Sequence, residues 1–325
     1  MTASTASTSA QERQRQHVLD RYHVVDSLPA TVYDDLVQVA AALCGTPIAV
    51  VSLIDRDRQW FKARLGLEDH ETTRDTAVCD HAIRQPDELL EIQDLSEDAR
   101  FNQFPIVTGD LKARFYAGMP LVTGDGEALG TVCVVDTQPR RLSGQQKASL
   151  RSLARVTMAL LDAHRAQHEA HAMAALQADT PSQGATKAST AGAAPAATGP
   201  AYAVAIIELQ GMADAARRLG DRALERQLQG MAPEFDACVK PELGDHVSRV
   251  TDSAEYIALL HGDGLEARVQ ALRTAAQKSG QREGLSLLVG AATATPGEAM
   301  HLVYLRAEEN LSQQKDAAAG ERAAA

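Results

Sequence analysis

The chain has 325 residues, a length that predicts two domains rather than a single core. Its formal net charge of −11 excludes nucleic acid and anionic membranes as main partners, because both are themselves negatively charged. No apolar run approaches the roughly 18 residues that a membrane span needs, and the first residues lack the apolar stretch of a signal peptide. The 4 cysteines form no CxxC pair, so we expect reduced thiols in a soluble cytoplasmic protein.

The first half of the chain carries the patterns of helices and β-hairpins. Residues 1–13 are rich in Ser, Thr and Ala and are expected to be disordered. A helical pattern follows over about 14–44. The β-rich runs of 47–67 and 116–136 each predict a hairpin, and a short strand over 89–94 lies between them.

A long helix is predicted to begin near Ser143. Leu150, Leu153, Leu160 and Leu161 form an apolar seam along this helix. Such a seam is typical of a helix that pairs with a second copy, and equally of a helix that packs on its own domain.

The rest of the chain predicts a flexible segment followed by an α/β domain. Residues 177–200 contain no large apolar side chain, so they cannot bury a core and we expect a flexible linker. Beyond it strands alternate with helices, which predicts a sheet covered on at least one face. The expected elements are a strand over 202–209, helices within 212–235, a hairpin over 247–260, a helix over 264–276, a strand over 285–293 and a helix over 296–314.

Four segments of the first half resemble a known family. They are PIAVVSLIDRDRQWFKARLGL from Pro47, AVCDHAI from Ala77, RFYAGMPLVTGDG from Arg114 and LGTVCVVDTQPRRLS from Leu129. In their order and spacing they are similar to successive blocks of a GAF domain, and the resemblance covers about residues 14–165. It implies a central antiparallel sheet with helices on both sides. It also implies a module that binds a small ligand or dimerises, and that regulates an attached output domain.

The GAF resemblance places candidate ligand-binding residues at Cys79, His81, Arg114 and Tyr116. Arg114 and Tyr116 would offer a cation and an aromatic wall to an anionic ligand, or would pack structurally on the sheet. Photosensory GAF domains hold a bilin with adjacent Cys and His residues, whereas one residue separates Cys79 from His81 here. Some GAF domains reduce free methionine sulfoxide with reactive cysteines. Cys79 and Cys133 would be such a pair, unless burial in an apolar strand makes Cys133 inert.

Fragments of the second half are similar, in their order, to a GGDEF domain, the catalytic unit of diguanylate cyclases. The resemblance covers about residues 202–315 and rests on AVAIIEL, RLGDRAL, RVTDSAEYIALL and SLLVGAAT. It implies conversion of GTP to cyclic di-GMP, with Mg²⁺ held by an acidic residue near the end of the first strand and another in the hairpin turn. Glu208 and Glu255 match those positions and would be the metal ligands of an active site.

Three departures from the family's pattern predict that this site has lost its chemistry. The turn Asp252–Tyr256 lacks both glycines of the signature, and Asp252 adds a carboxylate where phosphate would lie. The segment after the first strand is too short to hold the family's Phe-Lys and Asn-Asp groups. The tetrapeptide Glu242–Asp245 stands where an Arg-x-x-Asp product-binding motif should precede the turn.

We therefore expect a two-domain α/β (α+β) protein. Its expected parts are a disordered start over 1–13, a GAF domain over 14–165, a helix extension and linker over 166–200, a degenerate GGDEF-like domain over 201–315 and a disordered tail over 316–325. In the predicted function the GAF domain of a homodimer senses a small ligand or partner, and the second domain docks a partner or a nucleotide without catalysis. The alternatives are an active diguanylate cyclase that uses Mg²⁺ and a free methionine sulfoxide reductase. No other cofactor is implied, and the ligand of the GAF domain stays open.

Overall fold

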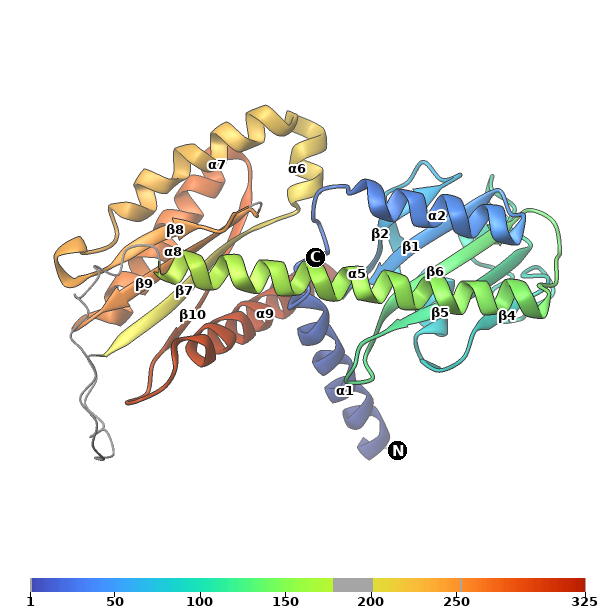
Figure 1. Cartoon of the computed structure of the whole chain (residues 1–325), viewed down its shortest axis with the longest axis horizontal. Coiled ribbons are helices and arrows are strands. Elements are labelled where there is room, and N and C mark those ends of the chain that lie inside the picture. The colour runs from blue at the N-terminus through green and yellow to red at the C-terminus, as the bar shows by residue number, and fades with distance from the viewer. Residues whose placement is uncertain (1, 178–200, 252, 325) are drawn as a thin grey trace, which may run out of the picture. The chain divides into compact units, whose positions relative to one another are not determined.

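A computed structural model describes residues 2–177, 201–251 and 253–324 of the chain. The predicted linker over 178–200 and Asp252 lie outside the described residues. The chain divides into two compact units, the second of which spans Ala166–Glu321; Figure 1 shows the elements of both. Among the described helices, none is long and apolar enough to cross a membrane.

The first unit is built on a six-stranded antiparallel sheet of order β3-β2-β1-β6-β5-β4. Its strands are β1 (Ile48–Ile54), β2 (Arg58–Leu65), β3 (Glu71–Thr73), β4 (Leu90–Ile92), β5 (Phe115–Val122) and β6 (Ala128–Asp136). Both predicted hairpins are present, as β1–β2 and β5–β6. The central strands β1 and β6 are buried at every position because both faces of the sheet are covered, which explains their almost continuous apolar runs.

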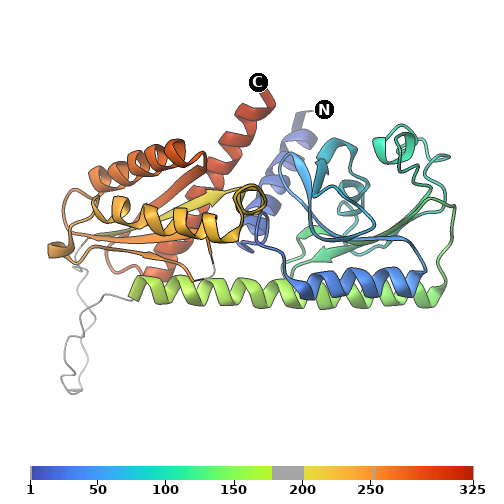
Figure 2. The ribbon, with the colours of Figure 1, turned by 90° about the horizontal axis from the view of Figure 1, so that it is seen from above.

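Helices cover both faces of this sheet. One face carries α2 (Thr31–Cys44), which contacts β1 and β2, and the beginning of α5 (Gly144–Gln177); Figure 2 shows the two helices along the same side. The other face carries α3 (Val78–Ala82), which contacts β5 and β6, and the loop with α4 (Pro105–Thr108). The helix α5 begins beside Ser143, where the sequence predicts its start, and Ser143 caps it: its hydroxyl accepts a hydrogen bond from the Gln146 amide at 3.2 Å, and the Gln146 side chain accepts one from the Ser143 amide at 2.9 Å.

The structure places helices where the termini were expected to be disordered. The helix α1 (Thr2–Asp20) replaces the expected disorder over 1–13, and α9 (Met300–Ala324) runs through the expected tail over 316–325. Composition does not reveal the contacts that fix α1: the guanidinium of the buried Arg15 donates to the carbonyl of Ile54 at 2.7 Å and to that of Ala128 at 3.3 Å, and Glu12 accepts from Arg74 at 2.6 Å. The predicted helical stretch over 14–44 is likewise broken, between α1 and α2.

The second unit is built on a four-stranded antiparallel sheet of order β10-β7-β9-β8. Its strands are β7 (Tyr202–Gln210), β8 (His246–Arg249), β9 (Glu255–His261) and β10 (Ser286–Thr293). The helices α6 (Met212–Leu219), α7 (Asp221–Asp236) and α8 (Leu265–Glu283) pack on one face, and α9 with the last turns of α5 packs on the other. The predicted α/β class with antiparallel sheets is confirmed in both units.

The turn between β8 and β9 closes a hairpin without glycine. The amide of Val250 donates to the carbonyl of Glu255 at 2.9 Å, and the amide of Ser253 donates to that of Val250 at 3.2 Å. Val250 and Ala254 are buried, so the turn is held by the core beneath it as well as by its own backbone. Among its described residues none has a positive φ, which explains why no glycine is needed there.

Candidate functional site

A cluster of buried polar side chains surrounds Cys79 in the first unit. Cys79 lies on α3, above the sheet face to which β1, β2, β5 and β6 contribute side chains. Ser52 and Thr131 are directly opposite each other on β1 and β6, and both are fully buried. Their hydroxyl oxygens are 3.2 Å apart, in the middle of an otherwise apolar layer. We call Ser52, Gln59, Cys79, Tyr116, Thr131 and Cys133 the thiol site.

Three hydrogen-bond donors converge on the sulfur of Cys79. The side-chain amide of Gln59 donates to it at 3.3 Å, the hydroxyl of Tyr116 at 3.3 Å and the hydroxyl of Thr131 at 3.2 Å. The hydroxyl proton of Thr131 is donated to the sulfur of Cys79. Ser52 is therefore the donor in the hydrogen bond between Ser52 and Thr131. The sulfur of Cys133 lies 3.8 Å from that of Cys79, and both cysteines are 2% exposed.

These surroundings favour a negative charge on Cys79. The hydrogen bond with Cys133 is the main cause that lowers the pKa of Cys79 below its ordinary value, against the opposing effect of burial, and the hydroxyls of Thr131 and Tyr116 act in the same direction. The same bond, together with burial, raises the pKa of Cys133 well above its ordinary value. The donors around Cys79 therefore make its thiolate easier to form than that of Cys133.

A glycine allows the ring of Tyr116 to reach this site. Tyr116 is 1% exposed, and its ring lies against Gly118, two residues along β5. A Cβ atom at Gly118 would be 2.2 Å from the Tyr116 hydroxyl oxygen, far inside van der Waals contact. Burial is the main cause that raises the pKa of Tyr116 well above its usual value, so the phenol stays a donor.

The other two predicted GAF-site residues lie apart from the sulfur's hydrogen-bond shell. His81 is half-buried and packs edge-on against Phe101, with ring centroids 4.8 Å apart; burial lowers its pKa. Arg114 donates to the carbonyls of Val107, Lys112 and Ala113 at 3.3, 3.2 and 2.9 Å, so its guanidinium fastens the loop before β5. The structure therefore brings Cys79 and Tyr116 together and gives Arg114 a loop-holding role.

Sequence reasoning missed Ser52, Gln59 and Thr131. A signal for two of them was present, because Ser52 and Thr131 each interrupt an apolar strand near its middle. Only the pairing of β1 with β6 shows that the two interruptions meet.

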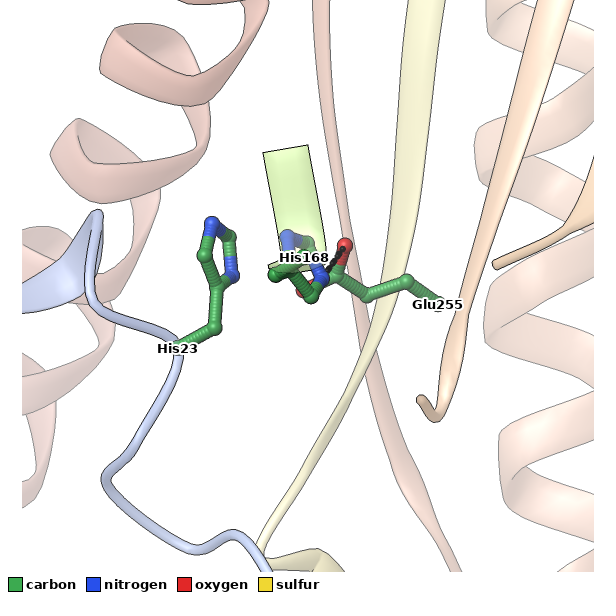
Figure 3. Close-up of side chains that lie close together, drawn as sticks. All are labelled: His23, His168 and Glu255. Atoms are coloured by element: carbon green, nitrogen blue, oxygen red, sulfur yellow. Dashed lines mark ion pairs between the residues drawn. The ribbon is translucent and has the colours of Figure 1, made fainter. Parts of the chain in front are cut away.

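In the second unit the two predicted metal ligands do lie together. Glu208 and Glu255 are directly opposite on β7 and β9, so their side chains leave the same face of the sheet. Each carboxylate, however, has its own cationic or polar partner. Glu208 accepts from the ammonium of Lys315 at 2.8 Å and from the amide of Gln210 at 2.7 Å. Glu255 lies 3.1 Å from the Nε2 atom of His168, and Figure 3 shows this pair.

This arrangement does not fit a magnesium site. Mg²⁺ prefers several hard oxygen ligands whose negative charge it can neutralise, and it keeps a nearly ideal octahedron with water. Instead, the ammonium of Lys315 from α9 balances the charge of Glu208, and the ring of His168 from α5 lies against Glu255. Glu255 is 3% exposed, so an ion there would have to bring its water ligands into the interior of the unit.

A second buried acidic side chain of this unit also has its partners within the unit. Asp245, at the predicted product-binding motif, forms an ion pair with Arg268, and both side chains are buried. Its carboxylate also accepts from the backbone amides of Lys240 at 2.9 Å and His261 at 2.7 Å. Asp245 therefore ties α8 to the loop before β8.

Comparison with known proteins bears on the first unit. Over 149 residues, 46% of this chain, the sequence is 37% identical to a cyclic di-GMP phosphodiesterase of Pseudomonas aeruginosa, and it covers 25% of that protein's length. Similar solved structures include the blue-light absorbing form of the PixJ GAF domain of Thermosynechococcus elongatus (16% identity, 50% of this chain and 96% of that one, TM-score 0.37). Another is the free methionine-R-sulfoxide reductase of Neisseria meningitidis (17% identity, 41% and 77%, TM-score 0.35). Residues 29–161 match the GAF domain family, so this part of the chain is a GAF domain.

Proposed function

We propose that this chain is a signalling protein in which the GAF domain is the sensory input and the second unit is a non-catalytic, GGDEF-like binding module. The observation that carries the proposal is the pairing of Glu208 with Lys315 and of Glu255 with His168. These are the two carboxylates on which a diguanylate cyclase mechanism would depend.

Electrostatics favours the ion pairs over a metal. A carboxylate that loses its cation is left with an uncompensated charge, and the free-energy cost of that charge rises with its burial. Mg²⁺ would have to displace both Lys315 and His168 and also recruit water. Metal binding at Glu208 and Glu255 would therefore cost the interactions that these carboxylates already make in the folded sheet.

The order of elements supports the GGDEF-like assignment. The second unit has a first strand, two helices, a hairpin, a helix, a strand and a last helix, in the sequence that the resemblance implies. The hairpin β8–β9 lies beside the first strand β7, which is where the family would place its signature turn. Asp245 and Arg268 use the product-binding position for an internal ion pair, which supports a module without that regulatory site.

The relative in Pseudomonas aeruginosa supports a role in cyclic di-GMP signalling. Its similarity to this chain is confined to 149 residues and so concerns the sensory part. We infer that the GAF domain regulates, through its attached unit, a partner in the turnover or reading of that nucleotide.

A homodimer is part of the proposal. On α2 the exposed side chains of Val32, Val39 and Leu43 are spaced by seven and four residues and so share one face, at 42, 45 and 48% exposure. Val156 on α5 is 49% exposed, on the helix that lies along the same side of the sheet (Figure 2). A second copy of the GAF domain would bury these groups.

The test of the proposed function is turnover of GTP by the full-length protein. The protein is incubated with GTP and Mg²⁺ and the mixture is separated by chromatography, with an active diguanylate cyclase as positive control. We expect no cyclic di-GMP. Product that disappears in the variant Glu255→Gln would overturn the proposal in favour of a working cyclase.

A further inference from the structure

We propose that Cys79 and Cys133 form a redox pair: a hydroperoxide oxidises the sulfur of Cys79, and Cys133 then closes an intramolecular disulfide. The inference concerns a modification site in the GAF domain. It stands whether or not the second unit docks a partner, because it rests on the thiol site alone.

The first argument is the number of donors that point at one sulfur. A buried cysteine is usually inert because its surroundings are apolar and hold it as a thiol. Here the side chains of Gln59, Tyr116 and Thr131 all donate to Cys79 within 3.3 Å. Such donors stabilise the thiolate, which is the form that attacks peroxide.

The second argument is the position of Cys133. Its sulfur is 3.8 Å from that of Cys79, whereas a disulfide bond measures about 2.0 Å, so the two atoms must approach by about 1.8 Å. Cys133 is fixed on the central strand β6, and Cys79 is on α3, a helix of 5 residues. We therefore expect two movements of α3: a local opening that admits the peroxide, and a return toward the sheet that closes the bond.

The reaction balances without a further reactant. The Cys79 thiolate attacks one peroxide oxygen, the O–O bond breaks, and the leaving hydroxide takes a proton to form water, so that Cys79 becomes a sulfenic acid. The sulfur of Cys133 then attacks the sulfur of Cys79, the S–O bond breaks, and the departing hydroxide takes the Cys133 proton as a second water. Two thiols lose two electrons in total, and the peroxide gains them.

The disulfide would change the site in two ways. It removes the anionic acceptor of Gln59, Tyr116 and Thr131, so these three donors lose their common partner. It also joins α3 covalently to the centre of the sheet. The chemical class of stimulus that this predicts for the GAF domain is an oxidant.

The other two cysteines serve as internal controls. Burial raises the pKa of Cys44 to about 11, and burial also raises the pKa of Cys238. Cys44 is buried on the opposite face of the sheet, on α2, and Cys238 lies in the second unit. Neither should react as fast as Cys79 at neutral pH.

The experiment uses reduced full-length protein, equimolar hydrogen peroxide at neutral pH, and peptide mass spectrometry after alkylation of the remaining thiols. We expect a peptide pair cross-linked through Cys79 and Cys133, reversible with dithiothreitol, while Cys44 and Cys238 stay alkylated. In Cys133→Ala the oxidation should stop at a sulfenic acid on Cys79 that dimedone traps. In Thr131→Val we expect about tenfold slower oxidation, because a donor to a charged group is lost.

Three results would overturn the proposal. One is an unreacted Cys79 in folded wild-type protein, as judged by circular dichroism of the same sample. Another is oxidation of Cys44 or Cys238 before Cys79. The third is a disulfide that forms with free methionine sulfoxide but not with peroxide, which would instead support a methionine sulfoxide reductase. The wild-type measurement decides the matter even if a variant fails to fold.

Discussion

The two units each bury a polar cluster on a sheet, and the clusters are built in opposite ways. In the thiol site three neutral donors converge on one sulfur, and the side chains that touch it bring no cation. In the second unit Glu208 and Glu255 stand side by side, yet each is paired with a basic side chain of a covering helix. The first cluster surrounds a sulfur with donors that favour its thiolate, whereas the second gives each carboxylate a basic side chain as partner inside the fold. A buried polar group thus indicates chemistry only when its partners have been identified.

The largest expected effect comes from closing the space that Tyr116 occupies. In Gly118→Ala the new Cβ would meet the Tyr116 hydroxyl oxygen at 2.2 Å, so the ring must leave the thiol site. We expect a loss of about 2–3 kcal/mol in the free energy of unfolding, as for other overpacked cores, together with slower reaction of Cys79 with peroxide. Urea denaturation measures the first effect. Gly124→Ala is the matched control, because no atom lies within 4 Å of its added Cβ.

Removal of the cation beside Glu208 should cost somewhat less. In Lys315→Ala the carboxylate of Glu208 loses a partner at 2.8 Å, on side chains that are 16% and 14% exposed. We expect about 1–2 kcal/mol of destabilisation, and less in the background Glu208→Gln, where no charge is left unpaired. Equal losses in both backgrounds would show that the two groups do not interact. Lys278→Ala, at an exposed position of α8, is the control.

Lowering the pH should destabilise the attachment of α1, because protonation of Glu12 weakens its ion pairs. Burial would raise the pKa of Glu12, but hydrogen bonds from Arg15 and Arg74 lower it from 4.5 to about 2. A lowered folded-state pKa contributes stability above the ordinary value and loses it as the pH falls. We therefore expect part of the stability to be lost between pH 4.5 and about 2 in the wild type and not in Glu12→Gln. Thermal denaturation across this range tests the prediction, with the exposed Glu88→Gln as control; identical pH profiles of all three proteins would contradict it.

The smallest effect on stability is expected from the exposed face of α2. Val39→Glu places a charge where 45% of the side chain is exposed, so the free energy of unfolding of the monomer should change by less than about 0.5 kcal/mol. The proposed homodimer should nevertheless dissociate. Light scattering at micromolar concentration measures the mass of both proteins. A wild-type monomer would contradict the dimer, and an unchanged dimer in the variant would place the interface elsewhere.

The hairpins were predictable because their signals are local. Thr123–Gly126 separates two β-rich runs, and the apolar run from Ile48 needs no knowledge of its neighbours to be identified as a buried strand. The α1 helix was not predictable from composition, since its contacts are with distant residues: Arg15 bonds to the carbonyls of two strands, and Glu12 pairs with Arg74.

The sites depend still more on distant contacts. Cys79, Tyr116, Glu208 and Glu255 were found from motifs, but a motif does not give the partners of its residues. Lys315 follows Glu208 by 107 residues, so only the folded sheet and α9 bring the two together. Sequence reasoning therefore identified the two carboxylates, but it could not identify the basic side chains that lie against them in the folded unit.

Calorimetric titration of the full-length protein with Mg²⁺ in the presence of GTP tests the central claim most directly. If Lys315 and His168 are the partners of the two carboxylates, the protein should add no Mg²⁺-dependent heat beyond that of Mg²⁺ binding to GTP in a protein-free titration, and Glu208→Gln and Glu255→Gln should behave as the wild type does. A Mg²⁺-dependent binding heat that both substitutions abolish would contradict the account, since it would show that these carboxylates hold a metal.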